Sequence, residues 1–494
     1  MKKIVIIALL LLSSKIGFSQ ELVSEIKLNL GKSRDIYQIV DESKKEVYFF
    51  CSDKVKTTAY RLNSVLQVID SISTARPKEK NSAIIGYTQS ESAQNLIWST
   101  GNGSDVLVQT YDFFKKTIKT KALNLDYKKE RFLQKISTNG LFYILSLIED
   151  SNILKIKIID KNGNLDVRTI DTSTYTLVDK YGEVASLYAI FDKVIYPLED
   201  RFSLKQITND TPNSLTFAAY KRKIYAYPNE LVLSFDNNIK FTQLYKINLT
   251  DFSISRTTIE QPTTNFQNVK DTYDPEDMTD KLPEINSNSF IIDDKILQIR
   301  LSAELVTVSI KNLNGVEIKS FTTKYDEPIA FKNTEIIQES GSVNSIKVLE
   351  SSNQFIRKLY NSNPAITCFE KDGSYYATIG SATGIVYGQT GAALAGGMFG
   401  VVGSLIAVAL SSNVNIQNYD SYQNRKIVYF SSLFDKNFNH ISGEMKSLPY
   451  EQLRKFAFSK SDDTDFTIFK FKNELYFGSY KMKSKVYSFY KFVQ

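Results

Sequence analysis

The stretch "GLFYILSLIEDSNILKIKIIDKNGNLDVRTID" (residues 140–171) shows the pattern that decides the fold. Three runs rich in Ile, Leu, Val, Phe and Tyr are separated by short segments of Asp, Asn, Ser and Gly. β-Branched and aromatic residues favour strands, and Asn and Gly favour the tight turns that join antiparallel neighbours. The stretch therefore predicts an antiparallel meander of short strands.

The same meander recurs along the chain. Copies begin at KEVYFF (Lys45), QNLIWST (Gln94), GLFYILSL (Gly140), RKIYAY (Arg222), DKILQIRL (Asp294), GSYYATIG (Gly373) and NELYFGSY (Asn473). Repeats of three or four strands are typical of the blades of a β-propeller, which this chain resembles in architecture. The sequence predicts an all-β β-propeller with about seven blades, and six or eight also fit, because the longer spacings require an insertion or a degenerate blade, for example at 188–202.

Two further features support the repeat. The turn DKNGN at 160–164 returns as DKNFN at 435–439, and NLNG ends at Gly315 in the equivalent place. The seventh copy lacks a last strand, while ELVSEIKLNLG at 21–31 is similar to the last strands of other copies. Pairing this segment with the last copy would remove unpaired edges, so we expect a propeller closed by an N-terminal strand. The alternative is a free N-terminal tail.

Residues 1–19 have the features of a secretory signal peptide. Lys2 and Lys3 precede the apolar run IVIIALLLL, and the small residues of GFS precede Gln20. No Cys follows this leader, so we expect no lipid anchor. The predicted organisation is a signal peptide at 1–19 and a single propeller domain at 20–494. The expected location is the periplasm, and association with the outer membrane is left open.

Composition excludes several function classes. The net charge is +7, and the three leader lysines account for three of these charges, which leaves +4 for the exported chain. This weak charge does not indicate nucleic-acid binding. His440 is the only histidine, so multi-histidine metal sites are excluded, and its position after a turn predicts a solvated side chain. Cys51 and Cys368 are expected in strands, and a disulfide between them is left open.

One acidic run is a weak metal-site candidate. The segment DTYDPEDMTD at 271–280 carries carboxylates at Asp271, Asp274, Glu276, Asp277 and Asp280. Carboxylate oxygens bind Ca²⁺, but the spacing is not that of an EF-hand loop, so a solvated acidic loop is the favoured interpretation. No nucleophile elbow or phosphate-binding glycine loop is present. We expect no cofactor and no catalytic residues, with a propeller hydrolase as the alternative.

The apolar stretch "GIVYGQTGAALAGGMFGVVGSLIAVAL" (384–410) has no charge and seven glycines. It lies in an insert at 381–412, between two strands of the sixth copy that should be antiparallel neighbours. Both ends of the insert should therefore leave the same side of the sheet, which favours a hairpin over a membrane span. Small residues recur every fourth position from Gly380 to Gly400, as in a glycine zipper, so we expect two closely packed helices at about 383–395 and 398–411.

This helical hairpin is the predicted binding element. Its partner-binding residues are expected to be Gly384, Gly388, Gly391, Leu394, Gly396, Gly397, Met398, Phe399, Gly400, Val401, Leu405 and Ile406. The hairpin has three candidate destinations: its own propeller or channel, a membrane leaflet, or a protein partner such as the mouth of a barrel. Glycine-rich helices need close packing to offset their low helix propensity, which favours a protein environment.

An exported, unlipidated propeller with an apolar hairpin resembles the periplasmic plug subunit of the type IX protein-secretion translocon. The resemblance rests on the leader, the blade-like repeats and the insert, and it implies a role in sealing an outer-membrane barrel. The residues themselves predict a non-enzymatic interaction or scaffold protein of the cell envelope. The alternative is a hydrolase or ligand-binding module whose hairpin packs on its own propeller or peripherally on a membrane.

Overall fold

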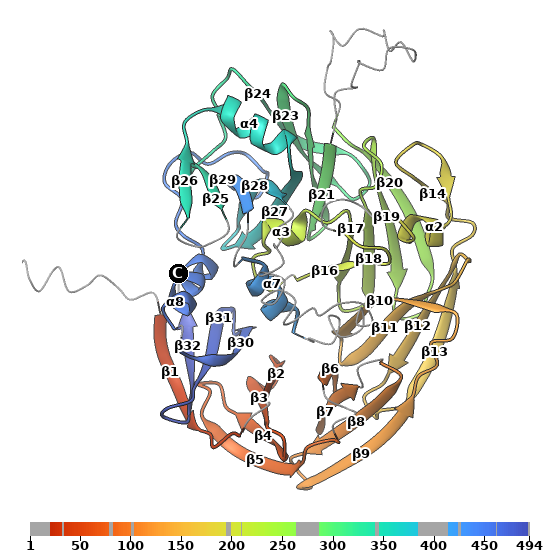
Figure 1. The fold of residues 1–494 in the computed structure, drawn as a ribbon, viewed down its shortest axis with the longest axis vertical. Helices are drawn as coiled ribbons and strands as arrows, with labels where there is room; N and C mark the ends of the chain where they lie inside the picture. The colour runs from red at the N-terminus through yellow and green to blue at the C-terminus, as the bar shows by residue number, and fades with distance from the viewer. Residues whose placement is uncertain are drawn as a thin grey trace, which may run out of the picture. The chain divides into compact units, whose positions relative to one another are not determined.

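The computed structural model describes residues 20–31, 34–78, 83–99, 103–193, 199–208, 210–262, 286–340, 345–383, 413–422, 426–460 and 462–492. The chain forms two compact units. Unit 1 contains residues 1–76 and 446–494, and unit 2 contains residues 77–445. Both units consist mainly of antiparallel sheets, whose strands are labelled in Figure 1.

Unit 1 has two four-stranded sheets. The first contains β2 (Asp35–Asp41), β3 (Glu46–Ser52), β4 (Lys56–Leu62) and β5 (Val68–Ala75). The second contains β30 (Thr464–Phe471), β31 (Glu474–Lys481), β32 (Val486–Phe492) and β1 (Gln20–Lys27), and helix α8 (Pro449–Ser459) precedes β30. β1 pairs antiparallel with β32, with Gln20 opposite Phe492. The N-terminal strand therefore completes the last sheet, as predicted.

Unit 2 has three sheets of four strands in chain order and two sheets of five. The four-stranded sheets contain β6 (Ala83–Gln89), β7 (Ala93–Ser99), β8 (Asp105–Asp112) and β9 (Thr117–Asn124); β10 (Glu130–Thr138), β11 (Leu141–Ile148), β12 (Ile153–Ile159) and β13 (Leu165–Asp171); and β21 (Asn286–Ile292), β22 (Lys295–Leu301), β23 (Leu305–Asn312) and β24 (Glu317–Lys324).

The five-stranded sheets each add a strand to this plan. One contains β16 (Lys205–Ile207), β17 (Arg222–Ala226), β18 (Glu230–Phe235), β19 (Phe241–Asn248) and β20 (Ile254–Glu260), with β16 parallel to β17. The other has the order β26 (Ile346–Leu349), β25 (Ile336–Ser340), β29 (Lys426–Phe434), β28 (Ser374–Thr383) and β27 (Asn363–Lys371). A short hairpin of β14 (Leu177–Val178) and β15 (Val184–Ala185) and helices α2 (Leu187–Phe191), α3 (Leu215–Ala218), α4 (Ser352–Tyr360) and α7 (Val414–Tyr422) complete the described elements.

Burial changes across each meander. In the sheet β6–β9, every residue of β7 is buried, whereas most of β9 is exposed, including Lys119 and Lys121. A four-stranded up-and-down sheet with a buried inner part and an exposed outer strand is the blade of a β-propeller. The described sheets therefore confirm the predicted all-β class and its blade-like repeat.

The turns at 160–164 and 435–439 have matching hydrogen bonds, which confirms their predicted equivalence. Asp160 Oδ1 accepts hydrogen bonds from the backbone amides of residues 162 and 164 at 2.8 and 2.7 Å. Asp435 Oδ1 accepts from the amides of residues 437 and 439, both at 2.8 Å. The residue in the left-handed region is Gly163 (φ 72°) in the first turn and Phe438 (φ 57°) in the second. The two segments therefore form the same type of turn. Glycine adopts the left-handed conformation of this turn without steric cost.

A lysine from the preceding sheet holds each of these turns. Lys121 Nζ in β9 donates to Asn164 Oδ1 at 2.6 Å, and Lys319 Nζ in β24 donates to Asn439 Oδ1 at 3.1 Å. Each asparagine is the last residue of its turn, and each lysine lies on the outer strand of the sheet before it. The repeat therefore extends to the contacts between neighbouring sheets.

The sixth copy departs from the prediction. The segment HISGEMKSL (440–448), expected as its last strand, makes only an isolated bridge between His440 and Phe434 among the described residues. The upstream strand β25 pairs with β29 instead, with Ile337 opposite Tyr429. Asn333 occupies the next part of that edge, because its side chain accepts from Leu433 N at 2.7 Å. The outer edge of β29 is therefore already occupied when the chain returns.

Two smaller expectations also need revision. The long hairpin predicted after Arg222 contains a further strand, β18, buried at five of its six residues. The segment around 188–202, considered as a degenerate blade, begins with helix α2 rather than a sheet. Ser186 caps this helix by accepting a hydrogen bond from Ala189 N at 3.0 Å, which satisfies an otherwise unpaired amide.

The core of unit 1 joins the two ends of the chain. Phe49 of β3 packs against Tyr487 and Phe489 of β32, with ring centroids 4.6 and 5.0 Å apart. Ile26 of β1 and Leu28 are buried in the same cluster. Burial of each large apolar side chain contributes about 1.5–3 kcal/mol, so the N-terminal segment contributes packing as well as strand pairing.

Candidate functional site

The site with most bearing on function is the root of the predicted insert. β28 and β29 pair antiparallel to their ends, and Thr383, the last residue of β28, lies opposite Lys426, the first residue of β29. Residues 384–425 therefore leave and rejoin the sheet at the same end. The predicted neighbour relation of these two strands is confirmed, and a segment attached in this way returns to the side from which it leaves.

The predicted binding residues lie outside the described residues. This holds for Gly384, Gly388, Gly391, Leu394, Gly396, Gly397, Met398, Phe399, Gly400, Val401, Leu405 and Ile406, and for the acidic residues Asp271, Asp274, Glu276, Asp277 and Asp280. The described residues contain no group of three or more His, Cys, Asp or Glu side chains suited to a metal ion. The helical hairpin and the acidic run stay predictions.

Gly380 has a different role from the predicted one. It lies in β28, so the four-residue glycine series starts on a strand and not on a helix. A Cβ atom at this position would lie 2.0 Å from the carbonyl oxygen of Val428 and 2.8 Å from Cα of Tyr429. Only glycine allows β28 and β29 to approach this closely at the root of the insert. β28 also continues to Thr383, within the predicted insert bounds of 381–412.

Helix α7 follows the glycine-rich stretch and is anchored to the segment 208–214. Asn418 Oδ1 accepts from the backbone amide of Ser214 at 3.1 Å, and Asn418 Nδ2 donates to the carbonyl oxygen of Pro212 at 2.8 Å. Asn415 Oδ1 accepts from the hydroxyl groups of Thr208 and Thr211 at 3.1 and 3.3 Å. We call this set of contacts the polar clasp.

The polar clasp also involves the cap of helix α3. Ser214 is the N-cap of α3, where its hydroxyl accepts from Phe217 N at 3.1 Å. The same hydroxyl lies 2.5 Å from the hydroxyl of Ser421 in α7. One capping residue therefore contacts both the start of α3 and the helix that follows the insert, which fixes α7 relative to α3.

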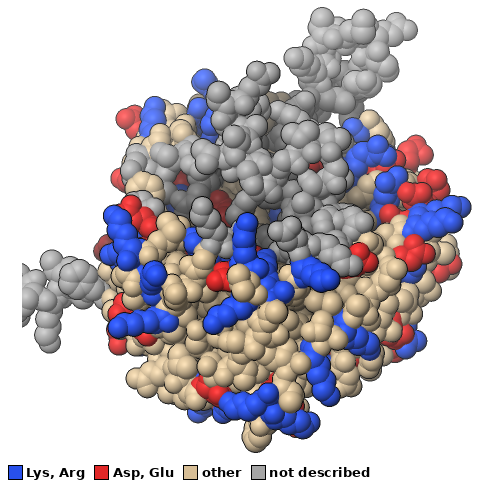
Figure 2. Space-filling model, turned by 60° about the horizontal axis from the view of Figure 1, so that its bottom comes forward, with Lys and Arg blue, Asp and Glu red and all other residues tan. Residues whose placement is uncertain are grey.

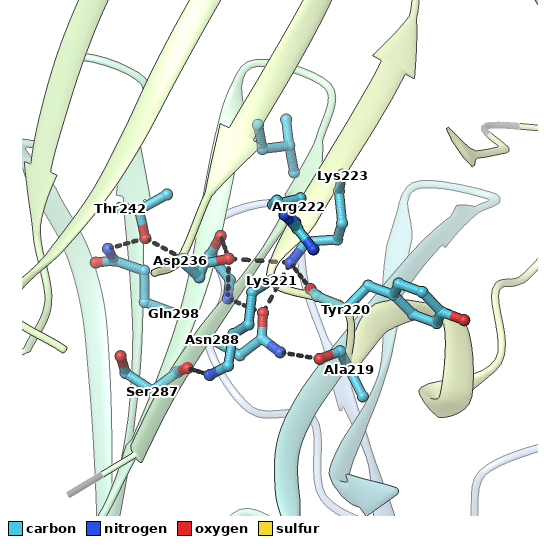
Figure 3. Close-up of polar contacts among 12 residues, drawn as sticks. Ala219, Tyr220, Lys221, Arg222, Lys223, Asp236, Thr242, Ser287, Asn288 and Gln298 are labelled. Atoms are coloured by element: carbon cyan, nitrogen blue, oxygen red, sulfur yellow. Dashed lines mark hydrogen bonds and ion pairs between the residues drawn. The ribbon is translucent and has the colours of Figure 1, made fainter. Parts of the chain in front are cut away.

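A second polar cluster lies between neighbouring sheets of unit 2 (Figure 3). Lys223 of β17 is fully buried, and its Nζ donates to Asp236 Oδ2 at 2.9 Å and to Asn288 Oδ1 at 2.7 Å. Asn288 of β21 in turn donates to the carbonyl oxygens of Ala219 and Pro364, both at 3.0 Å. Its amide thus connects the segments that begin β17, β21 and β27.

The residues beside Lys223 extend this cluster. Arg222 Nε donates to Glu199 Oε2 at 3.0 Å, and both side chains are almost completely buried. Lys221 Nζ donates to Asn286 Oδ1 at 2.8 Å and to the carbonyl oxygen of Ser287. Burial raises the pKa of Glu199, against the opposing effect of Arg222, and lowers the pKa of Lys221 to about 8.

The contacts of this cluster stabilise the fold. Lys221, Arg222 and Lys223 each donate to oxygen atoms of the chain, and removing one partner of such a buried pair leaves an uncompensated charge. Sequence analysis missed it because the partners are distant along the chain. The available signal was a run of three consecutive basic residues at the start of a strand that is otherwise apolar. Lys and Arg are rarely buried unless they are paired, so this run indicated buried partners.

His440 and the two cysteines have structural environments. His440 follows a turn as predicted but is only partly solvated, because its Nε2 lies 3.0 Å from Asn333 Oδ1, and burial lowers its pKa. Cys51 and Cys368 are buried and free, and burial raises the pKa of both thiols. A raised pKa disfavours the thiolate, the reactive form of cysteine.

Lys135 of β10 is the least compensated charge in the described part of unit 2. Its amine is shielded from solvent and has no hydrogen-bond partner among the described residues, although the residue as a whole is only half-buried. Burial lowers its pKa from the ordinary value of 10.5 to about 7. A neutral amine is therefore accessible near neutral pH at this position.

The surface does not show a single charge sign. On the face drawn in Figure 2, Lys and Arg side chains are interspersed with Asp and Glu. This distribution agrees with the weak net charge of the sequence. Among the described residues, no helix has the length and apolar character needed to cross a membrane.

Comparisons with known proteins give distant structural similarity. No protein-family model and no curated protein matches the sequence. The β-propeller domain of Nup133 from Vanderwaltozyma polyspora is 11% identical, with 96% of this chain and 97% of that chain covered and a TM-score of 0.31. Prolyl oligopeptidase B from Galerina marginata is 7% identical, with 91% and 47% covered and a TM-score of 0.31.

A third structure is cobalt-substituted ACO from Synechocystis, which is 8% identical, with 62% of this chain and 64% of that chain covered and a TM-score of 0.27. The chain thus spans less than two thirds of the length of this relative. At these identities and TM-scores, the assignment of the sheets as blades rests on their strand order and burial.

Proposed function

We propose that this chain is an exported, non-enzymatic interaction protein of the cell envelope, built as a seven-bladed propeller that its N-terminal strand closes. Its glycine-rich segment at 384–410 inserts into or seals a protein partner. The partner that we propose is an outer-membrane secretion barrel. The single observation that carries this proposal is the pairing of Thr383 with Lys426, which returns the apolar segment to its starting side.

Three properties of the chain support the proposal. The segment 384–410 has no charge and seven glycines, a composition that allows close approach to another protein surface. The sheet that bears it pairs without interruption up to Thr383 and Lys426, so the pairing of these two strands is complete before the segment begins. The first 19 residues have the features of a leader, which supports export to a compartment where envelope proteins are accessible.

The test replaces residues 384–425 with Asn-Gly, which joins Thr383 and Lys426 through a two-residue hairpin loop. Intact and replaced proteins are used as bait in detergent extracts of the source envelope. A matched control replaces Lys472 and Asn473, a hairpin turn in unit 1, with the same dipeptide. We expect an outer-membrane β-barrel protein to be recovered with the intact and control proteins and lost with the replaced protein.

Two results would reject the proposal. Recovery of the same barrel protein at equal yield with all three baits would show that the segment does not bind it. Failure of the replaced protein to fold, judged by its thermal unfolding transition, would show that residues 384–425, which include α7, are part of the core. A barrel protein lost only with the replaced protein supports the proposal.

A further inference from the structure

The outer strand β9 of unit 2 and the turn that leads into it carry only positive charge. β9 is the last strand of the sheet β6–β9 (Figure 1), and the stretch FFKKTIKTKALNL at 113–125 contains four lysines and no acidic residue. All four are exposed, namely Lys115, Lys116, Lys119 and Lys121. The outer strands β13, β20 and β24 each carry at least one Asp or Glu. β9 therefore differs from these three strands in its charge.

The turn that leads into β9 exposes an aromatic side chain. Phe114 is 86% exposed, the largest fraction among the exposed large apolar side chains of the described residues, whereas its neighbour Phe113 is buried. Asp112 Oδ1 accepts a hydrogen bond from the backbone amide of Lys115 at 2.9 Å, and Lys116 has a positive φ of 53°. These features define a tight turn, so Phe114 is held outward at the tip of the hairpin formed by β8 and β9.

The neighbouring strand β8 does not neutralise the charge of β9. In the register of the two strands, neither Lys119 nor Lys121 lies opposite an acidic residue. Asp112 Oδ2 lies 3.5 Å from Lys115 Nζ, but the Lys115 side chain is 78% exposed, and an ion pair in solvent contributes little. Lysines on an edge strand also prevent pairing with another chain, which accounts for Lys119 and Lys121 alone. It does not account for Phe114, because an exposed aromatic tip favours association.

We propose that the hairpin formed by β8 and β9 binds the surface of an anionic lipid bilayer. Phe114 inserts its ring at the boundary between lipid headgroups and acyl chains, where aromatic side chains are favoured. Lys115 and Lys119 contact lipid phosphates, and the adjacent lysines add to the attraction of the anionic surface. An apolar tip beside a basic stripe is the combination that peripheral membrane contacts use. This contact goes beyond the proposed function, because it does not involve residues 384–410.

Sedimentation with lipid vesicles tests the proposal on the chain from Gln20 onward, which contains every described residue. We expect vesicles of phosphatidylethanolamine with phosphatidylglycerol to bind about tenfold or more tightly than vesicles of phosphatidylcholine at low ionic strength, and added salt to reduce this preference. Phe114→Ser should weaken binding to the anionic vesicles about tenfold or more, because it removes the inserted ring. Lys115→Gln with Lys119→Gln should weaken binding about tenfold or more on the anionic vesicles only.

Val316→Ser is the matched control, because Val316 follows the corresponding turn of the sheet β21–β24 and is 62% exposed. We expect this variant to bind vesicles as the parent protein does. Trp98, the only tryptophan of the chain, is fully buried, so the fluorescence of Phe114→Trp and Val316→Trp reports on each added ring. Anionic vesicles should shift the emission of Phe114→Trp to shorter wavelength and leave that of Val316→Trp unchanged. The proposal is overturned if Phe114→Ser binds anionic vesicles as tightly as the parent protein, or if the emission of Phe114→Trp does not shift.

Discussion

Replacing Lys135 with Met should stabilise the protein, and by an amount that depends on pH. The substitution keeps most of the side-chain stem and removes an amine that is buried and has no partner among the described residues. Below pH 7 the amine is protonated in both the folded and unfolded states, so the full cost of burying the charge is present. Between pH 7 and 10.5 the unfolded chain binds more protons than the folded chain, and stability rises with pH.

The magnitude follows from the two pKa values. A tenfold change in proton affinity corresponds to about 1.36 kcal/mol, so the difference between about 7 and 10.5 gives a cost on the order of 5 kcal/mol at pH 6. At pH 9 the remaining cost is on the order of 2 kcal/mol. The stability advantage of the Met variant should therefore shrink by about 3 kcal/mol between these pH values.

Urea unfolding of the parent protein and the Met variant at pH 6, 7.5 and 9 measures this advantage. Lys119→Met on the exposed strand β9 is the matched control, because it removes the same charge from a solvated position. We expect the control to stay within about 0.5 kcal/mol of the parent protein at every pH. A Met variant that is less stable at pH 6, or whose advantage does not change with pH, would show that the amine is solvated or paired.

The remaining predictions concern the strands, a turn and the buried network. Deleting residues 21–31 removes the pairing partner of β32 and should lower the thermal midpoint by at least 10 °C, on the order of several kcal/mol; an unchanged midpoint would refute the closing role of this strand. Lys472→Asn with Asn473→Gly should raise stability by about 1 kcal/mol in urea unfolding, because both residues have positive φ (51° and 63°). Asp236→Asn should cost about 3–5 kcal/mol by leaving buried Lys223 without its carboxylate, and a double-mutant cycle with Lys223→Met that shows additive losses would contradict the pairing.

The sequence predicts those features of the fold that are local. The apolar runs of β11 and β12 and the mixed polar and apolar pattern of β13 depend only on neighbours along the chain, and so do the turns at Asp160 and Asp435. The pairing of β1 with β32 is distant along the chain, yet it was predictable because a missing strand at one end matched a spare strand at the other.

The features that the sequence does not reveal are set by competition between distant segments. HISGEMKSL has an acceptable strand pattern, but β25 and Asn333 occupy the edge of β29 on which it would pair. The buried charges of Lys221 to Lys223 depend on Glu199, Asp236 and Asn288, which no spacing rule brings together. The anchoring of α7 likewise depends on residues more than 200 positions away.

The insert is attached where the pairing of β28 with β29 ends. Strand pairing between β28 and β29 reaches Thr383 and Lys426, and Gly380 allows the two backbones to approach closely just before that point. The pairing of these two strands is therefore complete before residue 384. At the other end, α7 follows the insert and is held to residues 211–214 of the same unit by hydrogen bonds and by the burial of Tyr419 and Tyr422.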